Sequence, residues 1–141
     1  MAITSEENKP EYIIEAINKG YDCEIDLWQN ENGLFLGHDE PRYSIDCSFI
    51  TTYNNKLWIH CKNLEALYYC VKYEPFCNAF WHQQDNYTLT TQKYIWTYPN
   101  QRVNDNSVLV VNNRDYDIKN SYCYGICSDF VDFYKEKLYN K

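Results

Sequence analysis

The chain has 141 residues and a formal net charge of −7 at pH 7, with 45% hydrophobic and 18% aromatic residues. This length predicts a single domain over residues 1–141, and the hydrophobic content excludes a disordered chain. The acidic balance repels phosphates at long range, which argues against nucleic-acid coating, and no apolar run is long enough for a membrane span.

Hydrophobic patterning predicts alternating helices and strands. Helices are expected over residues 10–19, 64–72 and 130–138, where Pro10 suits a first turn, Gly20 a C-terminal cap and Asn63 an N-cap. Strand–helix–strand order is typical of the α/β class with a mostly parallel sheet, and three helices make the helical layer thin. Strands are expected over residues 21–28, 34–38, 57–62, 78–83, 94–98, 107–111 and 124–127, with a hairpin turn at Asn32-Gly33.

The cysteine pattern indicates reduced thiols in a cytoplasmic protein. The seven cysteines are an odd number without a CxxC pair, and the polar, acidic N-terminus lacks the features of a signal peptide. Disulfides are rare in the cytosol, and unpaired cysteines are among the most buried residue types. We therefore expect free, mostly buried cysteines.

Two acidic residues share one face of the strand over residues 21–28. Successive side chains of a strand point to opposite faces, so Glu24 and Asp26 project together. Adjacent carboxylates repel each other, and a bound Mg²⁺ or Ca²⁺, which prefers oxygen ligands, relieves that repulsion. An exposed acidic strand face is the alternative interpretation.

Other polar side chains end neighbouring strands. His60 and Lys62 share a face of one strand, His38 follows the apolar strand that ends at Gly37, and His82 follows another. Catalytic groups of α/β proteins lie at the carboxyl ends of strands, so these residues are candidates for a common site. Structural histidines that only pack or form hydrogen bonds remain the alternative for His60 and His82.

Several stretches together resemble the glycerophosphodiester phosphodiesterase family, over nearly the whole chain. The specific part is a Glu-x-Asp followed, after a hairpin, by His-Asp. The matching stretches are Glu7-Asn8-Lys9-Pro10-Glu11, Ala16-Ile17, Gly20-Tyr21, Glu24-Ile25-Asp26, Gly33, His38-Asp39, Ile95-Trp96-Thr97-Tyr98 and Tyr124-Gly125-Ile126-Cys127-Ser128-Asp129.

The resemblance implies a fold and roles for individual residues. It implies a TIM-type (β/α) barrel that cleaves phosphodiesters with a divalent cation, with Glu24 and Asp26 as metal carboxylates. His60 stands where the family has an acidic metal ligand, so the metal set becomes Glu24, Asp26 and His60. Lys62 matches a lysine that contacts phosphate, and His38 matches one of two catalytic histidines.

The chain departs from the family in two respects. The strand that ends in His-Arg-Gly and carries the other catalytic histidine is missing, and residues 2–5 are expected to be its remnant, running directly into Glu6. A full barrel takes about 250 residues, so the expected fold is a reduced, incomplete TIM-type barrel with few helices.

These features predict a slow, metal-dependent phosphodiesterase acting on a small phosphodiester. Catalytic residues would be His38, Lys62 and, partly replacing the missing histidine, His82. One alternative is a protein that binds phosphodiesters or phosphate without turnover, and another is a structural protein in which these residues are relics. An incomplete barrel also has an open edge, which predicts a possible homo-oligomer.

Overall fold

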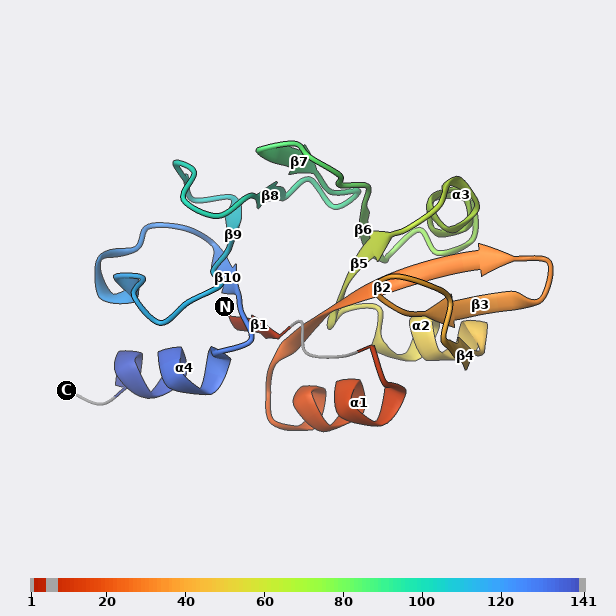
Figure 1. Cartoon of the computed structure of the whole chain (residues 1–141), viewed down its shortest axis with the longest axis horizontal. Coiled ribbons are helices and arrows are strands. Elements are labelled where there is room, and N and C mark those ends of the chain that lie inside the picture. Colours follow the sequence, from red (N-terminus) through yellow and green to blue (C-terminus); the bar gives the residue numbers. More distant parts are fainter. Residues whose placement is uncertain (1, 5–7, 140–141) are drawn as a thin grey trace.

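The computed structural model describes residues 2–4 and 8–139, which form a mixed α/β fold (Figure 1). Its helices are α1 (Pro10–Asn18), α2 (Cys47–Tyr53), α3 (Leu64–Tyr73) and α4 (Val131–Tyr139), with a 3₁₀ turn at Ile118–Asn120. Its strands are β1 (Ala2–Thr4), β2 (Asp22–Asn30), β3 (Gly33–Leu36), β4 (Tyr43–Ile45), β5 (Leu57–Cys61), β6 (Asn78–Phe80), β7 (Tyr87–Leu89), β8 (Ile95–Thr97), β9 (Ser107–Val110) and β10 (Gly125–Cys127).

Parallel ladders join seven of the strands in the order β6-β5-β2-β1-β10-β9-β8. Figure 1 shows these strands arranged around a ring, with β1 between β2 and β10. The long strand β2 continues past the ring and pairs antiparallel with β3, which in turn pairs with β4. Neighbours in the ring are therefore neighbours in sequence, apart from the β1–β10 pair.

The ring is not a closed barrel. Among the described residues, β6 pairs only with β5, and β8 pairs only with β9 and with the short antiparallel strand β7. Isolated bonds bridge this seam: the Thr91 amide donates to the Ala79 carbonyl at 2.8 Å, and the Ala79 amide donates to the Thr91 hydroxyl at 2.9 Å. The expected α/β class is thus confirmed, whereas the TIM-type barrel stays a prediction. The homo-oligomer inferred from an open edge stays a prediction.

Alternating side chains place three apolar clusters on the two faces of the sheet. On the outer face, Ile25, Leu27 and Ile59 join the main core beneath the helices. On the inner face, Trp58, Phe80, Trp96, Val108 and Cys127 form a second cluster. The polar residues of β2 and β5 also occupy this inner face, because they alternate with the outer core residues.

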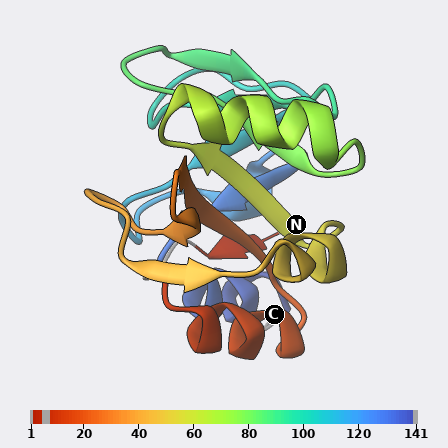
Figure 2. The same ribbon diagram turned by 90° about the vertical axis from the view of Figure 1, so that its right-hand side faces the viewer.

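The helices lie outside the ring (Figures 1 and 2). Helix α1 packs on β2, α3 packs on β2, β5 and β6, and α4 packs on β1. The start of α3 is fixed by the Asn63 side chain, which accepts a hydrogen bond from the Ala66 amide as an N-cap. Gly20, with φ of 93°, follows α1 in the left-handed region that glycine adopts without strain.

Most predicted elements are confirmed to within a few residues, and the expectation of only three helices is wrong. Helix α2 was missed because its seven residues are too few for a clear helical period. The strand expected at the chain start appears as β1, although Ser5, the last residue of the expected remnant, and Glu6, into which it runs, lie outside the described residues.

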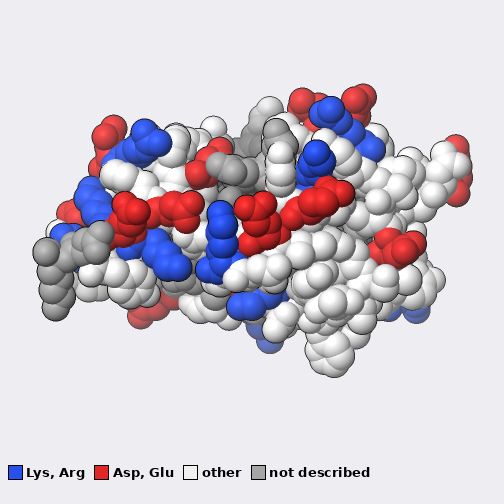
Figure 3. Space-filling view, turned by 90° about the horizontal axis from the view of Figure 1, so that it is seen from below, with Lys and Arg blue, Asp and Glu red and all other residues white. Residues whose placement is uncertain are grey.

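The surface charges, the helix lengths and the burial of the cysteines can each be compared with the expectations from the sequence. On the side of α1 and α4, basic side chains are interspersed with acidic ones rather than gathered into one basic field (Figure 3). No helix within residues 2–4 and 8–139 has the length and hydrophobicity needed to cross a bilayer. Cys47 is exposed and Cys123 half-buried, while the other five cysteines are buried, and all seven are free thiols.

Candidate functional site

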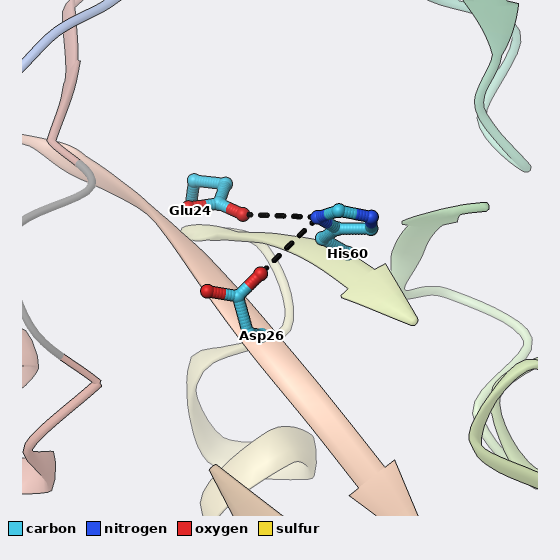
Figure 4. Close-up of side chains that lie close together, drawn as sticks. All are labelled: Glu24, Asp26 and His60. Atoms are coloured by element: carbon cyan, nitrogen blue, oxygen red, sulfur yellow. Dashed lines mark ion pairs between the residues drawn. The ribbon is translucent and has the colours of Figure 1, made fainter. Parts of the chain in front are cut away.

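Strands β2 and β5 bring three potential metal ligands together. Asp26 lies beside His60 in the parallel ladder, and Glu24 lies two residues earlier on the same face of β2. The His60 Nδ1 atom is 3.1 Å from Asp26 Oδ1 and 3.8 Å from Glu24 Oε1, as Figure 4 shows. One ligand atom from each residue lies within 4.8 Å of the other two. The prediction that these three side chains converge is therefore confirmed.

A backbone carbonyl orients the His60 ring. Its Nε2 atom lies 2.8 Å from the carbonyl oxygen of His82, which can only accept, so Nε2 carries the proton. The other ring nitrogen, Nδ1, consequently presents its lone pair to the two carboxylates when the imidazole is neutral. A lone pair facing carboxylate oxygens is repulsive unless a proton or a metal ion lies between them.

Asn8 holds the Asp26 end of the cluster. Its side-chain amide donates to Asp26 Oδ2 at 2.9 Å, and its oxygen accepts from the Asp26 backbone amide at 2.7 Å. Burial alone would raise the pKa of Asp26, but hydrogen bonds from His60 and Asn8, with the positive charge of His60 and Lys62, bring it below its ordinary value. Asp26 is thus built to remain a carboxylate.

Glu24 has the opposite electrostatic environment. Its side chain is only 11% exposed, and burial, followed by the adjacent charge of Asp26, raises its pKa well above the ordinary value. Lys62 counteracts part of this effect. The pKa of Glu24 is raised while that of Asp26 is lowered, because two negative charges in one buried site repel each other. Both groups are therefore ionised readily only when a cation compensates their charge.

His38 lies at the mouth of the same site. Its Nδ1 atom is 3.4 Å from Asp26 Oδ2, and its side chain is 76% exposed. Gly37 precedes it, and a Cβ atom at Gly37 would overlap the backbone carbonyl of Glu40, so the loop requires glycine. The Gly37 carbonyl also accepts a hydrogen bond from the Trp28 indole at 2.7 Å, which ties the loop to β2.

A cavity of about 600 Å³ contains the cluster. It opens at the carboxyl ends of β2 and β5, where active sites of parallel sheets lie. Sequence reasoning missed part of its lining, although residues that follow β1 and β10 were detectable by the same rule of strand ends. The lining comprises Glu24, Asp26, His38 and His60, together with the missed residues Asn8, Lys9, Arg42, Tyr43 and Asp129, and with Gly37.

The two remaining candidates lie beside the cavity rather than in its lining. Lys62 is close enough for its charge to lower the pKa of both Glu24 and Asp26. The His82 ring is 6.1 Å from the His60 ring, and its Nδ1 atom is buried without a hydrogen-bond partner among the described residues. Burial, followed by the charge of His60, lowers the pKa of His82, which favours the neutral imidazole.

The donor set fits a divalent cation. Two carboxylates and an imidazole nitrogen aimed at one point are a common ligand combination, and the hydrogen bonds from Asn8 and to the His82 carbonyl orient two of the three ligands. Comparisons with family models, with curated proteins and with solved structures found no match to this chain.

Proposed function

We propose that the protein is a reduced, open (β/α) barrel that uses a divalent cation, Mg²⁺ or Ca²⁺, to hydrolyse a small phosphodiester. The observation that carries the proposal is the convergence of Glu24, Asp26 and His60 ligand atoms within 4.8 Å in a cavity at the carboxyl ends of parallel strands. The family resemblance of the Glu-x-Asp and His-Asp stretches supplies the substrate class.

Each residue would have a distinct task. A divalent cation held by Glu24, Asp26 and His60 would neutralise the negative charge that builds up on the phosphate during nucleophilic attack. His38, exposed at the mouth, would hold or release a proton for the alkoxide that leaves. Lys62 would add positive charge beside the two carboxylates. Asn8 would keep Asp26 oriented and ionised.

The second candidate function is binding of a phosphodiester or phosphate without turnover. It is favoured by the small number of groups that could transfer a proton. Of the described residues that line the cavity, only His38 and His60 are histidines, and both ring nitrogens of His60 already face other partners. A single histidine then serves as acid or base, and His82 lies outside the lining. A positioned acid or base contributes about 10²–10⁴-fold, so the proposed enzyme is slow.

Hydrolysis of bis(4-nitrophenyl) phosphate and of glycerophosphocholine, each with Mg²⁺, Ca²⁺ or Mn²⁺, tests the proposal. We expect turnover that chelation abolishes, that Glu24→Gln reduces by at least about 100-fold and that His38→Ala reduces by a similar factor without lowering the melting temperature. Glu31→Gln, an identical change at an exposed turn, serves as the matched control.

The outcomes separate the two functions. If no diester is hydrolysed but cation and phosphate together raise the melting temperature, and Glu24→Gln abolishes that rise, the protein is a binder. If neither turnover nor a cation-dependent rise appears, both functions are wrong. Turnover that survives both chelation and Glu24→Gln also contradicts the proposal.

A further inference from the structure

A second cavity lies at the opposite end of the ring, where the strands begin. It has a volume of about 250 Å³. Asp22, Trp58 and Asn78 belong to the first residues of β2, β5 and β6, while Tyr94 and Tyr124 directly precede β8 and β10. The Glu24 cluster lies further along the same strands, so the two cavities are separate.

Three aromatic rings form one wall of this cavity. The Trp58 and Tyr94 ring centroids are 5.1 Å apart, those of Tyr94 and Tyr124 are 4.5 Å apart, and those of Trp58 and Tyr124 are 6.2 Å apart. Faces of aromatic rings attract cations, most strongly where water is excluded. The wall is therefore suited to an organic cation.

Asp22 supplies a buried negative charge beside these rings. The residue is 6% exposed, and its Oδ2 atom accepts a hydrogen bond from the Trp58 indole at 3.0 Å. Among the described residues, its Oδ1 atom forms an ion pair with the Lys56 ammonium at 3.8 Å, which is longer than a hydrogen bond. A carboxylate accepts up to about four hydrogen bonds, so Asp22 retains capacity for a donor.

Asn78 adds an unpartnered acceptor. The residue is 8% exposed, and its side-chain oxygen is buried without a hydrogen-bond partner among the described residues. A buried acceptor without a donor is costly, and native structures contain few of them. Asn78 lines the cavity, and because the terminal torsion of asparagine is soft, a rotation of its amide can turn the buried oxygen toward a donor there.

We propose that this cavity binds a small organic cation that carries N–H donors, of the alkylguanidinium or alkylammonium class. Its charged group pairs with Asp22 and lies against the rings of Trp58, Tyr94 and Tyr124, and one of its N–H donors reaches Asn78. The site is independent of phosphodiester chemistry, because none of these residues lines the Glu24 cavity.

Titration with methylguanidinium, followed by the indole N–H resonances of the ¹⁵N-labelled protein, tests the proposal. We expect the Trp58 resonance to shift saturably, with a dissociation constant of about 1 mM, as suits so few heavy atoms. Methylurea, the neutral ligand of almost the same shape, should leave the resonance unchanged. The other three tryptophans, which do not line the cavity, are internal controls.

Two variants should change the affinity in opposite directions. Asp22→Asn removes the negative charge and should weaken binding at least about tenfold, whereas Asp105→Asn, the same change at an exposed turn, should not. Lys56→Gln removes the competing ammonium and should strengthen binding severalfold. This second variant keeps the test decisive if Asp22→Asn fails to fold, because Lys56 is 41% exposed.

Several results would overturn the inference. These are the absence of a saturable Trp58 shift, an equal response to methylurea, and unchanged or weaker binding in Lys56→Gln. Unaltered affinity in a folded Asp22→Asn variant would overturn it as well, because the cation would then not depend on the carboxylate.

Discussion

Replacing Glu24 with glutamine should stabilise the metal-free protein and remove its response to divalent cations. The ligand oxygens of Glu24 and Asp26 lie within 4.8 Å of each other. Coulomb's law with an effective dielectric constant of about 20 gives a repulsion of about 3 to 4 kcal/mol if both are charged. His60 and Lys62 offset part of it, so we expect Glu24→Gln to gain about 1–2 kcal/mol, or about 3–6 °C in melting temperature, at neutral pH.

The sign of the pH dependence follows from the raised pKa of Glu24. Burial, then the charge of Asp26, makes the folded protein hold this proton more tightly than the unfolded chain does. The stability that Glu24 contributes through this tighter proton binding is fully present below the ordinary glutamate pKa. It is lost as pH rises through the higher pKa of Glu24 in the folded state. The advantage of Glu24→Gln should therefore be absent near pH 4 and grow as pH rises, according to the value of that pKa.

Differential scanning calorimetry between about pH 4 and about pH 8, in EDTA and in excess Mg²⁺ or Ca²⁺, provides the measurement. Cation at about 100 times its dissociation constant should add about 3 kcal/mol to the wild-type protein and much less to the variant. The reasoning fails if Glu24→Gln destabilises the metal-free protein at high pH more than Glu31→Gln does, or if its advantage does not grow with pH.

Three further substitutions test how the site is held. Asn8→Ala should lose about 2–4 kcal/mol, read by urea unfolding, because it removes the two hydrogen bonds that Asn8 makes with the Asp26 carboxylate and backbone amide, whereas Asn32→Ala at an exposed turn should be nearly neutral. Gly37→Ala should lower the melting temperature and the rate of diester hydrolysis together, since the added Cβ displaces the loop; an unchanged melting temperature would contradict this. Asn63→Ala should cost about 1–2 kcal/mol by circular dichroism, because it removes the α3 cap and a 2.8 Å bond to β2, and a loss below about 0.5 kcal/mol would count against it.

The elements of the ring were predictable because their signals are local. The alternation of side chains in β2 placed Glu24 and Asp26 on one face of the sheet. The same alternation in β5 placed His60 on that face as well, beside Asp26. The parallel pairing that makes Asp26 and His60 neighbours follows from strand order in an α/β sheet. Sequence reasoning therefore predicted that Glu24, Asp26 and His60 lie together, as the structure shows, while their role as metal ligands stays a prediction.

The features that sequence reasoning missed depend on contacts between distant segments. Asn8 contacts Asp26 across 18 residues of sequence, and an asparagine before a helix ordinarily indicates a cap. Arg42 and Tyr43, which line the cavity, lie at the end of the irregular turn after β3 and at the start of the short strand β4, and neither has a clear sequence pattern. Helix α2 has seven residues, too few for a clear helical period.

The open seam between β6 and β8 indicates where this fold can accept an insertion. From Phe80 to Ile95 the chain contributes one short strand, β7, and no helix, and single bonds rather than a ladder connect the two sides. An added strand–helix unit there would interrupt no parallel ladder and would leave both cavities' main residues on undisturbed strands. Insertions after Gln84, beyond the His82 carbonyl that orients His60, should consequently be accepted more readily than insertions within β2 or β5.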